Sequence, residues 1–209
     1  DKNLKREELL LKLMHLMSQK YKNDCVLKGG MLLRLYNSPR HTQDIDFVMR
    51  TKVSRKDIAK DIEGIIAKEN KITIENTSLN SRGIFIDVKS EDVLAQLEIS
   101  IVKEFDMEPE IMTTASLALP FNVSPQVVTV MPRSVAFSHK IAASLERKNL
   151  RDLYDLSLYE PQTEFDQPIL EKRLNALTVD REKPIQISFK DASLRLKKRT
   201  ENLTEEKFK

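Results

Sequence analysis

Two periodicities of apolar residues alternate along the first part of the chain. Leucine and methionine recur at helical spacing over 9–17, which predicts an amphipathic helix with one face in the core. Apolar and polar residues then alternate over 44–49, which predicts a β-strand with Ile45 and Phe47 pointing into the core. The chain therefore mixes helices and strands from its beginning.

The rest of the chain continues this mixture and then becomes helical. Ser54 with Asp57 resembles a capping box, and it predicts a helix that buries four isoleucines: Ile58, Ile62, Ile65 and Ile66. Strands are expected at 72–75, 83–88, 94–102 and 127–131, with a loop over 115–125 before the last one. These elements predict a mixed α/β fold over 1–131, followed by a mainly helical region over 132–209.

A glycine pair separates a short apolar strand from a helical turn. Val26-Leu27 is strand-like, Gly29-Gly30 is the only such pair among four glycines, and 31–36 has a helical pattern. A strand, a tight turn and a helix start together expose backbone N–H groups that can hold phosphate oxygens. We therefore expect Gly29 and Gly30 to contact a nucleotide triphosphate.

Two aspartates follow this turn closely. Asp44 stands fourteen residues after Gly30, and Asp46 occupies the next position on the same side of the predicted strand. Two carboxylates at close range repel each other, and a divalent cation relieves that repulsion while it bridges substrate phosphates. An all-oxygen site suits magnesium best, with manganese as an alternative.

A third carboxylate is expected from a neighbouring strand. Glu98 alternates with Leu97 and Ile99, so it faces away from the core, and Asp87 has the same pattern among Ile86 and Val88. We rank Glu98 above Asp87, although a solvated strand face would explain either residue. His15, His41 and His139 lack metal-ligand spacing, and a loop position explains His41 better than a substrate contact does.

Composition fits a globular enzyme. The chain has 209 residues, 40% of them hydrophobic, and a net charge of +3 that does not by itself indicate nucleic acid. The basic residues near the C-terminus, Lys190, Arg195, Lys197, Lys198 and Arg199, suit a solvated helix face better than an RNA contact. A single cysteine, Cys25, suits a reducing compartment, and no apolar run approaches membrane-spanning length. We expect a cytoplasmic protein that does not contact a membrane.

Two separated blocks resemble one known family. The segments 26–35 and 40–47, followed by 140–147 and 151–156, resemble the signature of the AbiEii/AbiGii toxins, which are DNA polymerase beta-like nucleotidyltransferases. The likeness covers roughly residues 20–160 and implies a nucleotidyltransferase-type sheet flanked by helices. Two departures occur, because Met31 stands where the family usually has Thr and Thr42 replaces a common Ser.

The resemblance also implies roles for the second block. On one helix from Pro132, Lys140, Arg147 and Arg151 would form a stripe, and a mostly exposed Lys140 could neutralise the triphosphate. Asp152 and Asp155 would pair with that stripe, or Asp155 would reach the nucleotide. The helical region would then complete the active-site cleft. The implied catalytic residues are Asp44, Asp46, Glu98, Lys140 and Asp155, and the implied nucleotide-binding residues are Lys28, Gly29, Gly30, Arg40, Thr42, Lys140, Arg147, Arg151 and Asp152.

The implied function is magnesium-dependent transfer of NMP from an NTP to an acceptor hydroxyl. Some members of the family modify the 3′ end of tRNA, so RNA is the expected acceptor, in a toxin–antitoxin or phage-defence role with a cognate antitoxin as possible partner. Two other functions stay open. A small-molecule nucleotidyltransferase would share the whole catalytic site, and a nucleotide-binding relative without transfer activity would keep the fold, although it would not need both aspartates.

Overall fold

The computed structural model describes residues 1–146, 150–159, 163–176, 194 and 197–198. The chain divides into two compact units, Asp1–Met131 and Pro132–Lys209. Among the described residues, no helix is both long and apolar enough to cross a membrane.

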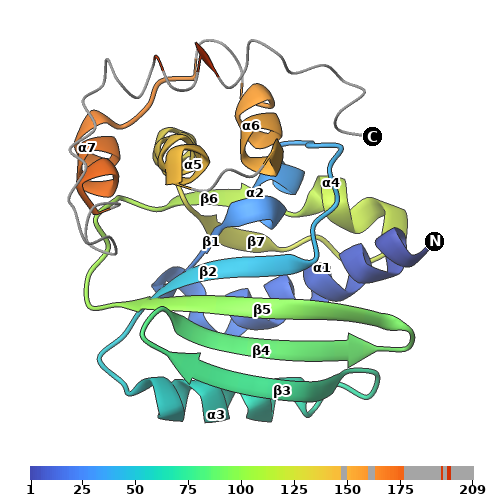
Figure 1. Ribbon diagram of the computed structural model, residues 1–209. Coiled ribbons are helices and arrows are strands. Elements are labelled where there is room, and N and C mark those ends of the chain that lie inside the picture. The colour runs from blue at the N-terminus through green and yellow to red at the C-terminus, as the bar shows by residue number, and fades with distance from the viewer. Residues whose placement is uncertain (147–149, 160–162, 177–193, 195–196, 199–209) are drawn as a thin grey trace. The chain divides into compact units, whose positions relative to one another are not determined.

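The first unit is built on one mixed sheet of seven strands (Figure 1). Its order is β3-β4-β5-β2-β1-β7-β6. Strand β2 pairs antiparallel with β1 and parallel with β5, so the strand with the two aspartates lies inside the sheet. The strands are β1 (Cys25–Lys28), β2 (Asp44–Arg50), β3 (Thr73–Asn80), β4 (Gly83–Ser90), β5 (Val93–Val102), β6 (Glu110–Thr113) and β7 (Val127–Val130).

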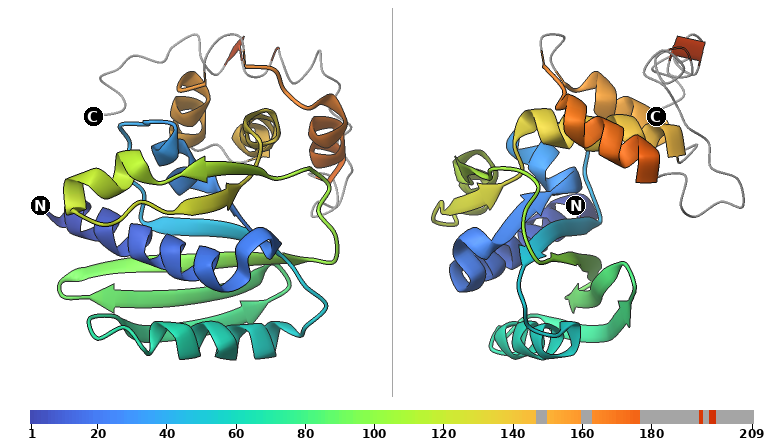
Figure 2. Two further views of the ribbon diagram at one scale, coloured as in Figure 1. Left: turned by 180° about the vertical axis from the view of Figure 1, so that it is seen from behind. Right: turned by 90° about the vertical axis from the view of Figure 1, so that its left-hand side faces the viewer.

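Helices cover one face of this sheet. Helix α1 (Lys2–Tyr21) lies behind the sheet in Figure 1 and in front of it in the reversed view of Figure 2, and it packs on β5, β7, β1 and β2. Helix α3 (Arg55–Ile66) packs on β3 and β4. Ile45 and Phe47 of β2 are fully buried, which confirms the predicted strand and its core face. The short elements are η1 (Lys22–Asp24), α2 (Gly29–Leu35), α4 (Ala115–Ala118) and η2 (Leu119–Phe121).

The start of α3 confirms the predicted cap. The Ser54 side chain accepts a hydrogen bond from the Asp57 backbone N–H, which satisfies one of the free donors of the first turn. Ile58, Ile62 and Ile66 are buried on the core side. Ile65 is only half-buried, because it lies beside the core stripe and not within it.

The structure of this unit differs from the expectations in three details. The segment 115–125 is not all loop, because α4 and η2 lie within it and bury Leu117 and Ala118. Strand β6 was not expected, since its exposed residues show no alternation, and it forms only as an edge partner of β7. The strand expected at 72–75 runs instead from Thr73 to Asn80.

The second unit is helical where it is described. It contains α5 (Arg133–Glu146), α6 (Leu150–Ser157) and α7 (Gln167–Ala176), and α5 packs against both of the others. Its core consists of Ile141, Ala142, Leu170 and Leu174, with Phe137, Leu145 and Leu156 packed against it. Phe137, Ile141 and Leu145 recur at helical spacing along α5, so this face of the helix contributes to the core of the unit.

Candidate active site

The glycine turn is shaped by two very close approaches. Strand β1 runs directly into α2, and Gly29 has a φ of +72°, a left-handed conformation that favours glycine. A side chain at Gly29 would overlap the Asp46 carboxylate, and a Cβ at Gly30 would stand 2.7 Å from Thr42 Oγ1. Both glycines are therefore required by contact with residues of the predicted site.

The two aspartates share the sheet face opposite the core. Asp44 and Asp46 are both half-buried, while the intervening Ile45 is fully buried. The Thr42 hydroxyl donates a hydrogen bond to the Asp44 carboxylate. Lys28 of β1 is the register partner of Asp46, and its Nζ lies 3.9 Å from Asp46 Oδ1. The strand, the turn and the segment before the strand thus meet at these carboxylates.

The sheet register separates the two candidates for a third carboxylate. Glu98 of β5 is the direct parallel partner of Asp46, so both side chains project from the same face. Asp87 of β4 pairs with Gln96, one strand further from β2, and accepts a hydrogen bond of 2.6 Å from Gln96 Nε2. Position in the sheet therefore favours Glu98, as the sequence ranking did.

The donor chemistry at this face suits a hard divalent cation. Asp44 and Asp46 supply carboxylate oxygens from neighbouring positions on one side of one strand, and magnesium prefers such ligands. Among the described residues, no group of three or more His, Cys, Asp and Glu side chains converges at metal-binding range. The fit to the ion therefore rests on the donor chemistry of these two aspartates.

A buried cluster supports the segment between α2 and β2, and sequence reasoning missed it. Glu7 of α1 is 6% exposed, and its two oxygens bond Arg34 Nη2 at 2.6 Å and His41 Nδ1 at 2.9 Å. Arg34 also donates to the Ser38 carbonyl, and Arg40 Nη1 donates to the His41 carbonyl at 3.3 Å. The one signal of this cluster in the sequence is that Glu7 continues the apolar face of the helix predicted over 9–17 although it carries a charge.

In the second unit, Lys140 is paired with two carboxylates. Its Nζ lies 2.5 Å from Asp155 Oδ2 and 3.6 Å from Asp152 Oδ1. The pair joins α5 to α6, because fifteen residues along one straight helix would separate the two side chains by about 22 Å. The ion pairing considered for Lys140 is thus present in the structure, whereas a phosphate contact of Lys140 or Asp155 stays a prediction.

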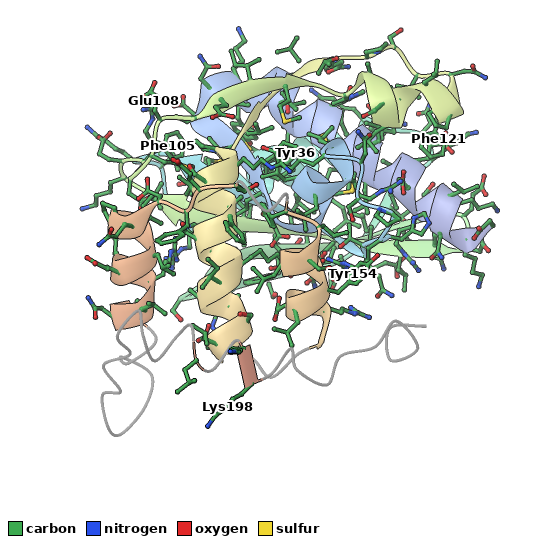
Figure 3. The ribbon with its side chains drawn as sticks, turned by 90° about the horizontal axis from the view of Figure 1, so that it is seen from above. Tyr36, Phe105, Glu108, Phe121, Tyr154 and Lys198 are labelled. Carbon is green, nitrogen blue, oxygen red and sulfur yellow. The ribbon has the colours of Figure 1, made fainter. Side chains whose placement is uncertain are left out.

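The predicted cationic stripe is not found on one helix. Lys140 lies on α5, which ends at Glu146, whereas Arg151 lies on α6, which begins at Leu150. Arg151 is exposed. Arg147, like Lys190, Arg195 and Arg199 of the basic C-terminal group, lies outside the described residues. Of that group, Lys197 and Lys198 are described and exposed, and Figure 3 shows the Lys198 side chain pointing away from its ribbon.

Two titratable residues of the first unit serve its core. His15 is buried in α1 and bonds Thr114 Oγ1 at 2.9 Å, and burial lowers the pKa of its imidazole. Cys25 is fully buried in β1, and burial raises the pKa of its thiol. Neither residue points to a ligand, so both are accounted for by packing.

Comparison with known proteins matches the chain to a family model. A family model described as "Nucleotidyl transferase AbiEii toxin, Type IV TA system" matches residues 12–209. A search of the curated proteins found no match. The family match spans both units of the chain and includes every residue of the predicted site.

Solved structures share the fold. MenT4, a nucleotidyltransferase toxin from Mycobacterium tuberculosis H37Rv, is 18% identical over 91% of this chain and 72% of its own, with a TM-score of 0.61. JHP933 from Helicobacter pylori is 20% identical over 86% of this chain and 75% of its own, with a TM-score of 0.57. A second H. pylori protein, assigned as a nucleotidyltransferase, is 17% identical over 95% and 93%, with a TM-score of 0.56. At these identities, the likenesses show the mixed α/β fold.

Proposed function

This chain belongs to the AbiEii nucleotidyl transferase toxin family of type IV toxin–antitoxin systems, and from that premise we propose that it transfers NMP from an NTP to an RNA hydroxyl with the help of magnesium. The observation that carries the proposal is the contact between the glycine turn and Asp46, where no side chain fits at Gly29. A substrate phosphate held by the turn would lie beside the carboxylates that hold the metal.

Asp44 and Asp46 are proposed to hold the magnesium, or manganese in its place. When bound, the ion would supply Lewis-acid stabilisation of the charge on the transferring phosphoryl group. Thr42 donates to Asp44, and this bond would keep one carboxylate oriented. Lys28, which lies 3.9 Å from Asp46, would compensate part of the negative charge at the site.

Glu98 is proposed to accept the proton of the attacking hydroxyl, and Asp46 stays the alternative. Its support is its place beside Asp46 in the sheet, on the face that carries both aspartates. A general base must reach the hydroxyl whose proton it removes, and Glu98 on the neighbouring strand would supply that carboxylate. The P–O bond to the leaving pyrophosphate breaks as the bond from the acceptor oxygen forms.

The nucleotide would be held mainly by the first unit. Backbone N–H groups of the glycine turn would contact phosphate oxygens, and cationic side chains would balance their charge. In the first unit, the residues proposed for these contacts are Lys28, Gly29, Gly30, Arg40 and Thr42.

The acceptor and the partner are proposed from the family. Type IV toxin–antitoxin systems imply a cognate antitoxin, and MenT4 is a toxin of the same fold. We propose tRNA, at its 3′ end, as the acceptor, which would place the reaction in the cytoplasm. A small-molecule acceptor would use the same carboxylates and is the alternative that the experiment has to separate.

The test uses each labelled NTP with total RNA, magnesium and the protein, and then separates RNA from small molecules. Label should enter RNA with the wild type and disappear with Asp46→Asn, which keeps the shape of the side chain but removes its charge. Asp87→Asn is the matched control, since Asp87 is another half-buried carboxylate of the same sheet one strand further away. Wild-type transfer by Asp46→Asn would refute the metal site, and label in small molecules alone would refute the RNA acceptor.

A further inference from the structure

The cluster around Glu7 lies next to the site and has no role in the reaction described above. Charged side chains are almost never fully buried unless they are paired, and Glu7 is 6% exposed. Both of its oxygens are used, one by Arg34 Nη2 at 2.6 Å and the other by His41 Nδ1 at 2.9 Å. A carboxylate only accepts, so His41 donates from Nδ1, which fixes the tautomer of a neutral imidazole.

The two partners of Glu7 belong to different parts of the site. Arg34 lies on α2, the helix that begins at Gly29, and it also donates to the Ser38 carbonyl. Ser38 is buried, and its backbone N–H donates to the Leu33 carbonyl at 2.9 Å. His41 comes directly before Thr42. Glu7 therefore ties the first helix of the unit to both ends of the segment 36–43.

Thr42 is the residue through which this segment contacts the proposed metal site. It is buried, its hydroxyl donates to the Asp44 carboxylate, and its Oγ1 would stand 2.7 Å from a Cβ at Gly30. Thr42 thus lies close to the glycine turn and is bonded to the strand. Along the segment 36–43, Thr42 is restrained by its neighbour His41, which is bonded to Glu7.

We propose that Glu7 is a positioning residue for nucleotidyl transfer, which acts through His41 and Arg34 to hold Thr42 against Asp44. The inference rests on the proposed roles of Thr42 and Asp44. Hydrogen bonds in which the donor or the acceptor is ionised are short and strong, so a buried carboxylate that accepts two of them fixes the positions of its partners. Partners that orient a metal ligand usually change activity by about 10–100-fold when they are lost.

Glu7→Gln tests this role, because it keeps the size of the side chain and removes its charge. We expect kcat to fall about tenfold or more, with a smaller change in KM for the NTP. The matched control is Glu69→Gln, which breaks another ion pair of α1, that of Lys12 Nζ with Glu69 Oε2 at 2.6 Å. Glu69→Gln should leave kcat unchanged. A folded Glu7→Gln protein with wild-type kcat would overturn the proposal.

A double-mutant cycle separates positioning from general stability. If Glu7 acts through Thr42, then Glu7→Gln and Thr42→Val should lower kcat together by less than the product of their single effects. Thr42→Ser, which keeps the hydroxyl, should restore the sensitivity of kcat to Glu7→Gln. Independent, multiplicative effects would overturn the coupling.

Two further measurements keep the proposal testable. Hydrogen exchange should rise in the segment 36–43 with Glu7→Gln and not with Glu69→Gln, and unchanged exchange would overturn the anchor without any activity assay. If Glu7→Gln does not fold, His41→Ala removes the same bond from its exposed end and should lower kcat in the same way. Normal turnover in these variants with loss in Asp46→Asn would overturn only the role of Glu7, whereas normal turnover in Asp46→Asn would overturn the site itself.

Discussion

Replacing Lys140 by alanine is the most direct test of the ion pair between α5 and α6. The side chains of Lys140, Asp152 and Asp155 are 16%, 6% and 1% exposed. The expectation of a mostly exposed lysine is therefore wrong, because two carboxylates of α6 draw the ammonium inward. Lys140→Ala would leave both carboxylates buried without their shared cation.

The expected magnitude follows from that burial. Breaking a buried ion pair by removing one partner costs about 3–5 kcal/mol, because a buried charge is left without compensation. An exposed pair contributes only about 0–1 kcal/mol. For a chain of this size, each kcal/mol lowers the melting temperature by about 2–4 °C. Lys140→Ala should therefore lower the melting temperature by at least about 6 °C.

Urea and thermal unfolding, followed by circular dichroism, measure this change. Lys12→Ala is the matched control, because Lys12 forms an ion pair of similar length with Glu69 while its side chain is 43% exposed. It should change the free energy of unfolding by about 1 kcal/mol or less. A Lys140→Ala protein as stable as the wild type would refute the reasoning. Near-normal turnover in the same protein would also end the proposed contact between Lys140 and the nucleotide phosphates.

Three other predictions follow from the first unit and from the acceptor. Gly29→Ala should abolish transfer and destabilise the protein, because a side chain at a φ of +72° costs about 1–2 kcal/mol and the added Cβ would overlap Asp46. The control is Gly64→Ala in α3, where a Cβ meets nothing within 4 Å, and it should stabilise the protein by about 0.5–1 kcal/mol. A stable and active Gly29→Ala protein would contradict the close approach of Gly29 to Asp46. Burial lowers the pKa of His15 in the folded protein below its ordinary 6.5. The free energy of unfolding should therefore be highest above pH 6.5 and fall as the pH drops below 6.5, because the unfolded chain then binds a proton at His15 more readily than the folded protein. Urea midpoints on both sides of that pH should therefore differ less in His15→Gln than in the wild type, and equal differences would refute the assignment. With an RNA acceptor, binding should weaken steeply with salt, and replacing the exposed Lys197 and Lys198 by alanine should flatten the slope if they contact phosphates; an unchanged slope would remove both from the RNA surface.

The sequence predicted the local backbone structure around the candidate site well. The strand, the glycine turn and the alternation around Asp44 and Asp46 are short-range patterns, and the backbone periods fix which side chains share a face. The ranking of Glu98 over Asp87 used the same alternation, but only the pairing of β5 with β2 shows which residue is the neighbour of Asp46.

Contacts between distant segments could not be predicted. Glu7 meets Arg34 and His41 only because α1 packs on the sheet near the glycine turn, and nothing in the local pattern specifies that packing. The prediction that Lys140 and Arg151 lie on one helix was wrong for a similar reason. The prediction extended one helical spacing over residues that belong to two separate helices, α5 and α6, and Lys140 pairs with Asp155 of α6.

The parallel pairing of β2 with β5 also has a consequence for protein synthesis. Glu98 follows Asp46 by 52 residues, whereas β1 and β2 are joined by a much shorter connection. At about 5–20 residues per second, a ribosome would need about 3–10 seconds after Asp46 to add Glu98. During that interval the two aspartates would lie on a strand without its parallel neighbour. A growing chain of this family would therefore carry its glycine turn and both aspartates for several seconds before Glu98 completes the row of carboxylates across the sheet.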